Sequence, residues 1–227
     1  MLLIDTDPQG SLTASLGYVE PDELQDSLAT VLEAVIDEEE FEAEKGILHH
    51  DEGVDVLLGN IELSAIEVAM TSIMSREVMM REYLERVKEK YDYILIDCMP
   101  SLGMMTVNAL VAVDSVLIPV QAAYLPVKGL QKLIKTINMV KKRLNKKLCV
   151  EGILLTMVDF RTNFTKDIAA TVHQLYVSIG VFEVVIPSSI KAVETSAVGA
   201  SVYQHCPNVK VAKAYTELTR EVLNHER

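Results

Sequence analysis

The chain has 227 residues, of which 49 % are hydrophobic, and its formal net charge is −12. This length and apolar fraction are sufficient to fill the core of a globular protein. The longest apolar stretches are interrupted before the roughly 18 residues that a membrane span needs, and the N-terminus does not follow the signal-peptide pattern. We therefore expect a cytoplasmic protein with no membrane association. Its three cysteines form no CxxC pair, so they indicate neither a zinc cage nor a disulfide framework.

The negative charge is concentrated in one segment. Thirteen acidic residues and one lysine lie between Glu20 and Glu52, and they account for the whole net charge. Within this segment, we interpret the stretch DELQDSLATVLEAVIDEEEFEAE as a solvated surface helix and loop, with a docking surface as the alternative. In contrast, Ser115 to Val150 holds eight basic residues and no acid. One basic face on an acidic protein is therefore expected.

Apolar runs alternate with longer amphipathic segments along the chain. The runs predict strands at Met1 to Ile4, Val54 to Leu58, Tyr93 to Ile96, Ser115 to Val120, Cys149 to Met157 and Phe182 to Ile186. Apolar residues spaced three, four or seven apart predict helices over Ile73 to Tyr91 and Leu130 to Leu144. This alternation is typical of an α/β protein whose mostly parallel sheet has helices on both faces. We expect a single domain over residues 1–227, because no long linker or internal repeat divides the chain.

Two of the predicted strands end in acidic side chains. Asp5 and Asp7 follow the first strand, and Asp97 ends the run YDYILID. Because open parallel sheets bind ligands beyond the carboxyl ends of their strands, we expect these carboxylates to face one crevice. Such oxygen ligands suit Mg²⁺ with a nucleotide, and Asp7 is placed to orient or deprotonate an attacking water. The alternative is that these acids only cap turns and helices.

Several segments together resemble one protein family. LLIDTDPQGSLTASLG resembles the first switch segment of the ParA/Soj group of partition ATPases, in the MinD-like class of P-loop NTPases, and YDYILIDCMPSLGMMTVNAL resembles its Walker B strand and second switch. VDSVLIPVQAAYLPVKGL resembles the next strand and helix, GILLTMVDFRTNF the nucleotide-base strand, and the segment from VVIPSSIK to TELTREV the C-terminal region. The resemblance covers nearly the whole chain, and it implies a P-loop NTPase-like fold.

The resemblance implies roles for individual residues. It makes Asp7 the residue that positions the hydrolytic water, Asp97 the acid that acts on Mg²⁺ through water, and Asp5 an indirect partner of the same ion. Gly103 would belong to the mobile second switch. The residues that would flank the adenine are Thr156, Met157, Pro187 and Ser188.

The resemblance also implies cofactors and partners. In the family, two protomers sandwich ATP, the dimer binds DNA without sequence preference, and a ParB-like partner stimulates hydrolysis. We therefore expect ATP and Mg²⁺, an ATP-dependent homodimer when full length, and a cytoplasmic, nucleoid-associated protein. The predicted DNA patch joins Lys191 to the basic end of a helix, formed by Lys141, Lys142, Arg143, Lys146 and Lys147. The alternative is that the basic helix end only favours the helix dipole.

The sequence departs from the family pattern at several places, one of which is Met99, where the family usually has proline. The pattern IPRxVR reads IPSSIK here, so Ser188 and Lys191 stand where the family has arginines, and a lysine offers no bidentate fork. The phosphate loop KGGxGKT, which the family places before the segment that opens this sequence, occurs nowhere in the 227 residues. We expect that a first strand, phosphate loop and first helix are missing, through an internal start or a decayed copy.

The missing loop affects the expected function. Without its backbone amides and lysine, the acids would face a triphosphate that nothing neutralises, so we expect impaired ATP binding and hydrolysis. The alternative function is a non-catalytic remnant that binds a ParB-like partner. A dinucleotide-dependent oxidoreductase is a weaker alternative, because the sequence has no GxGxxG.

Overall fold

The computed structural model describes residues 1–159 and 161–225. The chain divides into two compact units, Met1–Val113 and Asp114–Arg227, and each unit has its own sheet. The predicted α/β fold with a mostly parallel sheet is confirmed. That residues 1–227 form a single domain stays a prediction.

The first unit is built on a four-stranded sheet with the order β2-β3-β1-β4. Its strands are β1 (Leu2–Asp5), β2 (Ile47–His50), β3 (Val54–Leu57) and β4 (Ile94–Asp97). Its α-helices are α1 (Ser11–Ser15), α2 (Leu28–Ile36), α3 (Leu63–Ala69), α4 (Met79–Val87) and α5 (Met104–Ala112). Short 3-10 helices are η1 (Pro21–Glu23), η2 (Met70–Ser72) and η3 (Lys88–Lys90). β1 pairs in parallel with β3 and β4, whereas the unpredicted strand β2 forms an antiparallel hairpin with β3.

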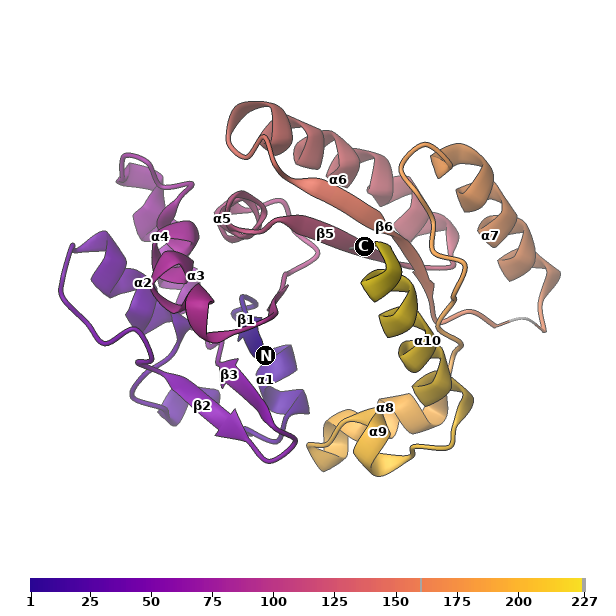
Figure 1. The fold of residues 1–227 in the computed structure, drawn as a ribbon, viewed down its shortest axis with the longest axis horizontal. Coiled ribbons are helices and arrows are strands. Elements are labelled where there is room, and N and C mark those ends of the chain that lie inside the picture. Colours follow the sequence, from indigo (N-terminus) through magenta and orange to yellow (C-terminus); the bar gives the residue numbers. More distant parts are fainter. Residues whose placement is uncertain (160, 226–227) are drawn as a thin grey trace. The chain divides into compact units, whose positions relative to one another are not determined.

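The acidic segment contains a core helix of the first unit. α2 buries Leu28, Ala29, Val31, Leu32 and Val35, and Figure 1 shows it grouped with α3 and α4. The interpretation of this segment as a solvated surface helix was therefore wrong. The acids mostly precede and follow the apolar stretch LATVLEAVI, in which Glu33 is the acidic residue and is exposed. The high net charge of the whole acidic segment thus gave no indication of the amphipathic helix within it.

The helix predicted over Ile73 to Tyr91 is shorter in the structure. α4 begins at Met79, and η3 separates its end from Tyr91. The buried side chain of Asn108 in α5 holds the start of α4, because its Oδ1 accepts a hydrogen bond from the Met80 amide (3.1 Å). Its Nδ2 donates to the carbonyl oxygens of Arg76 (2.8 Å) and Met104 (3.1 Å). Asn108 therefore ties the segment before α4 to α5.

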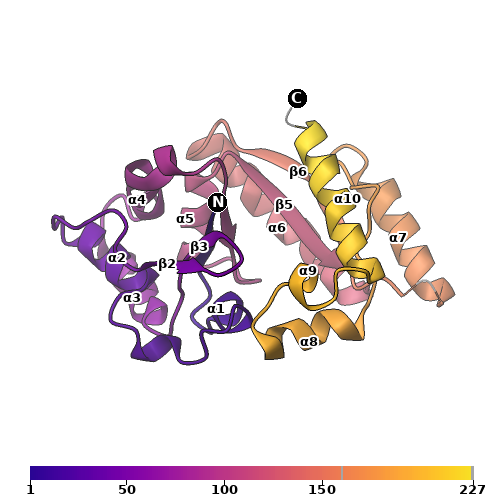
Figure 2. The same cartoon turned by 60° about the horizontal axis from the view of Figure 1, so that its bottom comes forward.

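The second unit contains the parallel pair β5 (Ser115–Gln121) and β6 (Cys149–Thr156). Its helices are α6 (Tyr124–Arg143), α7 (Asn163–Tyr176), α8 (Ile190–Val198), α9 (Val202–His205) and α10 (Lys210–His225). Figures 1 and 2 show α6 lying along the two strands. From α10, Val211, Ala214 and Leu218 pack in one cluster with Leu154 of β6.

The strand predicted at Phe182 to Ile186 is not a regular strand. Isolated parallel bridges join Ile153 to Val181 and Val158 to Pro187, so the segment runs beside β6. In between, Glu221 of α10 accepts hydrogen bonds from the amides of Glu183 (2.9 Å) and Val184 (3.2 Å). These amides bond a side chain, which interrupts a continuous strand.

Candidate functional site

Asp5 and Asp97 are register partners at the carboxyl ends of β1 and β4. Because register partners in a parallel ladder point to the same face of the sheet, both carboxylates lie on one face at one end. The pKa of Asp97 is raised, first because surrounding atoms desolvate its carboxyl group and second because Asp5 and Asp7 repel its charge. Asp97 nevertheless stays accessible to solvent. The structure therefore brings the three predicted acids together.

Asp5 is fully buried, and both oxygens of its carboxylate accept hydrogen bonds. Oδ1 accepts from the Asp7 amide (3.1 Å), and Oδ2 accepts from both the amide and the hydroxyl of Thr13 (2.8 Å each). Gly59, which follows β3, closes the site from another side, because a Cβ there would lie 2.6 Å from the Asp5 carbonyl oxygen. Asp5 thus holds the turn that carries Asp7 against the start of α1.

Asp7 lies in a tight turn and is half-buried. Its Oδ1 accepts a hydrogen bond from the Gln9 amide (2.9 Å), and its carbonyl oxygen accepts from the Gly10 amide (2.9 Å). Gly10 has a φ of +59°, a left-handed conformation that favours glycine. No hydrogen bond from the described residues engages Oδ2 of Asp7. This oxygen is available to orient a water molecule.

The pairing of β1 and β4 continues past the acids. The amide and hydroxyl of Thr6 both donate to the carbonyl oxygen of Asp97, at 3.0 and 2.7 Å. The loop Cys98–Gly103 then leads to α5, where Gly103 occupies the N-cap position. The predicted switch glycine therefore lies at the far end of the loop that begins at Asp97.

The donor set suits Mg²⁺ only as a partial site. Among the described residues, no group of three or more His, Cys, Asp or Glu side chains is arranged to hold a metal ion. Mg²⁺ commonly takes one or two protein carboxylates and fills its other positions with water and phosphate oxygens. Asp97 and Asp7 fit that requirement, whereas both carboxylate oxygens of Asp5 already accept hydrogen bonds.

The four predicted nucleotide-base residues lie together in the second unit. Thr156 ends β6, and the bridge between Val158 and Pro187 brings the two segments side by side. The Ser188 amide donates to the Val158 carbonyl oxygen (3.1 Å). Met157 has a φ of +52° and is 61 % exposed. A left-handed methionine costs about 1–2 kcal/mol, and such strain is concentrated at functional sites.

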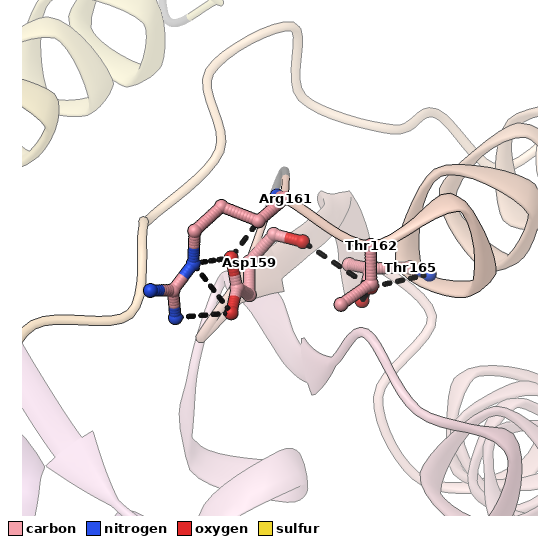
Figure 3. A network of polar contacts seen from close by, with 4 residues as sticks. All are labelled: Asp159, Arg161, Thr162 and Thr165. Atoms are coloured by element: carbon pink, nitrogen blue, oxygen red, sulfur yellow. Dashed lines mark hydrogen bonds and ion pairs between the residues drawn. The ribbon is translucent and has the colours of Figure 1, made fainter.

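A cavity of about 940 Å³ opens beside these segments, and Pro187 and Ser188 contribute to its lining. Its charged lining residues are Asp159, Arg161, Lys191, Lys210, Lys213 and Glu217. Arg161 pairs with Asp159 at 2.7 Å, and hydrogen bonds from Arg161 lower the pKa of Asp159 to about 2 (Figure 3). Thr162 accepts from the Thr165 amide (3.3 Å) and caps α7 beside this pair (Figure 3). The charged groups that line the cavity are therefore more often basic than acidic.

Sequence reasoning missed Lys210 and Lys213 as neighbours of Lys191. They lie three residues apart in α10, a spacing that places them on one helix face. Lys191 itself pairs with Glu194 of α8 at 2.7 Å. The spacing in KVAK was visible in the sequence, but its approach to Lys191 depends on how α8 and α10 pack.

The predicted DNA patch is divided in the structure. Its helix-end members lie at the C-terminus of α6 and in the turn before β6: Lys141, Lys142, Arg143, Lys146 and Lys147. All five are exposed, and none forms an ion pair with another residue of the described ranges. Lys191 belongs to the cavity near Val158, beyond the other end of β6. An eight-residue strand spans about 26 Å, so Lys191 does not join the α6 cluster.

None of the helices in the described part of the chain is long and apolar enough to cross a membrane.

Comparison with known proteins relates these sites to a family. A family model described as an AAA domain matches residues 1–150. The chain is 39 % identical to the sporulation initiation inhibitor protein Soj of Bacillus subtilis, and the match covers 98 % of this chain and 85 % of that protein. It is 36 % identical to the chromosome partitioning protein ParA of Myxococcus xanthus, over 99 % of this chain and 77 % of that protein.

Solved structures have the same fold. The structure titled cobyrinic acid a,c-diamide synthase from Mycobacterium smegmatis, with a bound ATP analogue and magnesium, is 31 % identical with a TM-score of 0.86. That match covers 100 % of this chain and 82 % of that one. A plasmid partition protein from Borrelia burgdorferi bound to AMPPNP has a TM-score of 0.78 at 21 % identity, covering 99 % and 86 % of the two chains. At that identity, the similarity shows the fold alone.

Proposed function

This chain belongs to the ParA/Soj family of P-loop partition ATPases. From that premise we propose that it acts as an ATPase in the partitioning of plasmid, chromosomal or mobile-element DNA. The observation that carries the proposal is the register pairing of Asp5 with Asp97, with Asp7 in the adjoining turn. Partition relatives at 39 % and 36 % identity support the same reading.

Each acid has a distinct role in this proposal. Asp97 would hold Mg²⁺ through water, since its carboxylate is accessible at the strand end. Bound Mg²⁺ would neutralise phosphate charge. Asp7 would orient the attacking water with Oδ2, while its Oδ1 is fixed by the Gln9 amide. Asp5 keeps the turn in place, because its buried carboxylate bonds the Asp7 amide and Thr13.

Thr156, Met157, Pro187 and Ser188 are proposed to flank the adenine. The support is their adjacency at one end of β6 and the exposed, left-handed Met157. A flexible, polarisable methionine side chain packs well against an aromatic ring.

We also propose, from family membership, that the protein binds DNA, forms an ATP-dependent homodimer and is stimulated by a ParB-like protein. The two basic clusters of the second unit support the DNA contact.

We propose that the 227 residues alone bind and hydrolyse ATP poorly. They contain no Gly-Lys-Ser/Thr sequence, so no loop of that kind cradles the phosphates beside the acids. This absence also supports the second candidate, a non-catalytic module that binds a ParB-like partner.

One experiment separates the two candidates. Mg²⁺-dependent ATP turnover and nucleotide affinity are measured for the 227-residue chain and for a form extended at Met1 by a strand, a KGGxGKT loop and a helix. We expect turnover in the extended form, with Asp7→Ala abolishing turnover but retaining nucleotide binding. Binding of a ParB-like protein without turnover in either form would instead favour the non-catalytic module.

A further inference from the structure

Gly103 is the N-cap residue of α5, the helix that follows the loop from Asp97. Glycine has no side chain with which to accept a hydrogen bond from the first turn of a helix. Its φ of −72° is ordinary for any residue, so the backbone conformation does not require glycine here. Another residue must therefore supply the acceptor for the first-turn amides of α5, and another reason must explain why position 103 is a glycine.

Glu67 of α3 supplies the cap from another helix. Its Oε1 accepts a hydrogen bond from the amide of Met105 (3.4 Å), the second residue of α5. A carboxylate at this position also faces the positive end of the helix dipole. The three heavy atoms nearest to a Cβ added at Gly103 all belong to the Glu67 carboxyl group, and Oε1 would overlap it. A Cβ at Gly103 would therefore displace the Glu67 carboxylate from the start of α5.

The capped helix start also holds the end of the loop. The hydroxyl of Thr106, a buried residue of α5, donates to the Ser101 carbonyl oxygen (2.8 Å). The Gly103 amide donates to Ser101 Oγ (3.4 Å). At its other end the loop is fixed to the residue that follows β1, because the Thr6 hydroxyl donates to the Asp97 carbonyl oxygen. The conformation of Cys98–Gly103 thus depends on where α5 begins.

We propose that Glu67 is a positioning residue for the loop Cys98–Gly103, which it fixes by capping α5 in place of Gly103. That this loop affects ATP turnover rests on the proposed function, in which the loop belongs to the second switch. Glu67 acts through the loop and needs no contact with the nucleotide.

A double-mutant cycle on the 227-residue chain tests the contact between the two residues. Gly103→Ala alone should destabilise the chain, because its Cβ displaces the Glu67 carboxylate. In a Glu67→Ala background the same Cβ has room, so Gly103→Ala should then cost clearly less stability than in the parent. An equal loss of stability in both backgrounds overturns the proposal.

Hydrogen exchange on the same chain tests the capping. We expect Glu67→Ala to lower protection of the amides from Gly103 to Met105 roughly fivefold, the usual size of a lost cap. Glu67→Gln keeps an acceptor oxygen and should retain much of the protection. Glu82→Ala, at an exposed position of α4, is the matched control and should leave these amides unchanged. Unchanged protection in Glu67→Ala, or a uniform loss across the first unit, overturns the proposal.

Turnover in the loop-extended form shows whether the positioning matters for function. Glu67→Ala should lower kcat several-fold with little change in KM for ATP, as expected for a residue that orders a catalytic loop. If the unsubstituted extended form neither binds nor hydrolyses ATP, the proposed function fails. The hydrogen-exchange result then still decides whether Glu67 caps α5.

Discussion

Asp5 Oδ2 accepts two hydrogen bonds from Thr13, one from its amide and one from its hydroxyl, each 2.8 Å long. Both residues are fully buried. The pair fastens the end of β1 to α1 and so fixes the intervening turn, which carries Asp7. A single threonine therefore supports the geometry of the acid cluster without being part of it.

The first prediction concerns this pair. Thr13→Val preserves the shape of the side chain but removes the hydroxyl donor to a buried carboxylate. We expect the free energy of unfolding to fall by about 2 kcal/mol, because hydrogen bonds to charged groups contribute about 1.5–3 kcal/mol. Urea unfolding followed by circular dichroism measures the loss. Thr71→Val is the control, since its hydroxyl bonds the Val68 carbonyl oxygen at an exposed position, and an equal loss there would contradict the prediction.

The second prediction concerns Asn108, which is buried and joins α4 to α5. Asn108→Ala leaves the Met80 amide and two carbonyl oxygens without their partner and creates a cavity. We expect a loss of about 2–4 kcal/mol in the free energy of unfolding. The exposed Asn224→Ala in α10 should change it by less than about 0.5 kcal/mol. Similar losses in both variants would argue against this role of Asn108.

The third prediction follows from the raised pKa of Asp97, which results first from desolvation and then from repulsion by Asp5 and Asp7. Between the ordinary pKa of 3.8 and the higher folded value, the folded chain binds more protons than the unfolded chain. Stability therefore decreases as pH rises through this window and does not recover above it. We expect Asp97→Asn to be more stable than the parent at neutral pH.

The pH dependence of the melting temperature provides the check. Below the ordinary pKa of 3.8, Asp97 is protonated in both states, so the advantage of Asp97→Asn should disappear there. An advantage of the same size at every pH would show that charge is not its cause.

The fourth prediction concerns the left-handed backbone of Met157. Asparagine tolerates this conformation, whereas a β-branched residue does not. We expect Met157→Asn to raise the free energy of unfolding by up to about 1 kcal/mol and Met157→Val to lower it by about 1–2 kcal/mol. Because Met157 is 61 % exposed, differences in burial add little. Equal stability of the two variants would show that the conformation relaxes.

The fifth prediction separates the two basic clusters as DNA contacts. Lys210→Ala with Lys213→Ala removes two charges from the cavity, and Lys141→Ala with Lys142→Ala removes two from the end of α6. We expect the cavity pair to reduce the slope of log affinity against log salt by about 2, since each phosphate contact contributes about 0.9. Binding to duplex DNA is titrated for the ATP-bound, loop-extended form at several salt concentrations. A reduced slope only in the α6 pair would reassign the contact to that cluster.

The sequence determined the acid cluster and the parallel strands that carry it. In the runs that end in Asp5 and Asp97, the apolar residues indicate a buried strand and the aspartate marks its carboxyl end. Neighbouring parallel strands bring such ends to one edge of the sheet. The motifs around these runs also sufficed for the family. The acidic segment was wrongly interpreted as a solvated surface helix, because its charged residues lie mainly on either side of α2 and the apolar stripe of α2 is short.

Only the tertiary structure decided which distant side chains meet. Nothing in the local pattern links Glu67 to Gly103, Asn108 to Met80, or Lys191 to Lys210, because each pair comes from separate elements. The same holds for Glu221, which occupies amides that a regular strand would have used. Periodicity records how strongly each residue avoids water, whereas the choice of partner depends on how the helices pack.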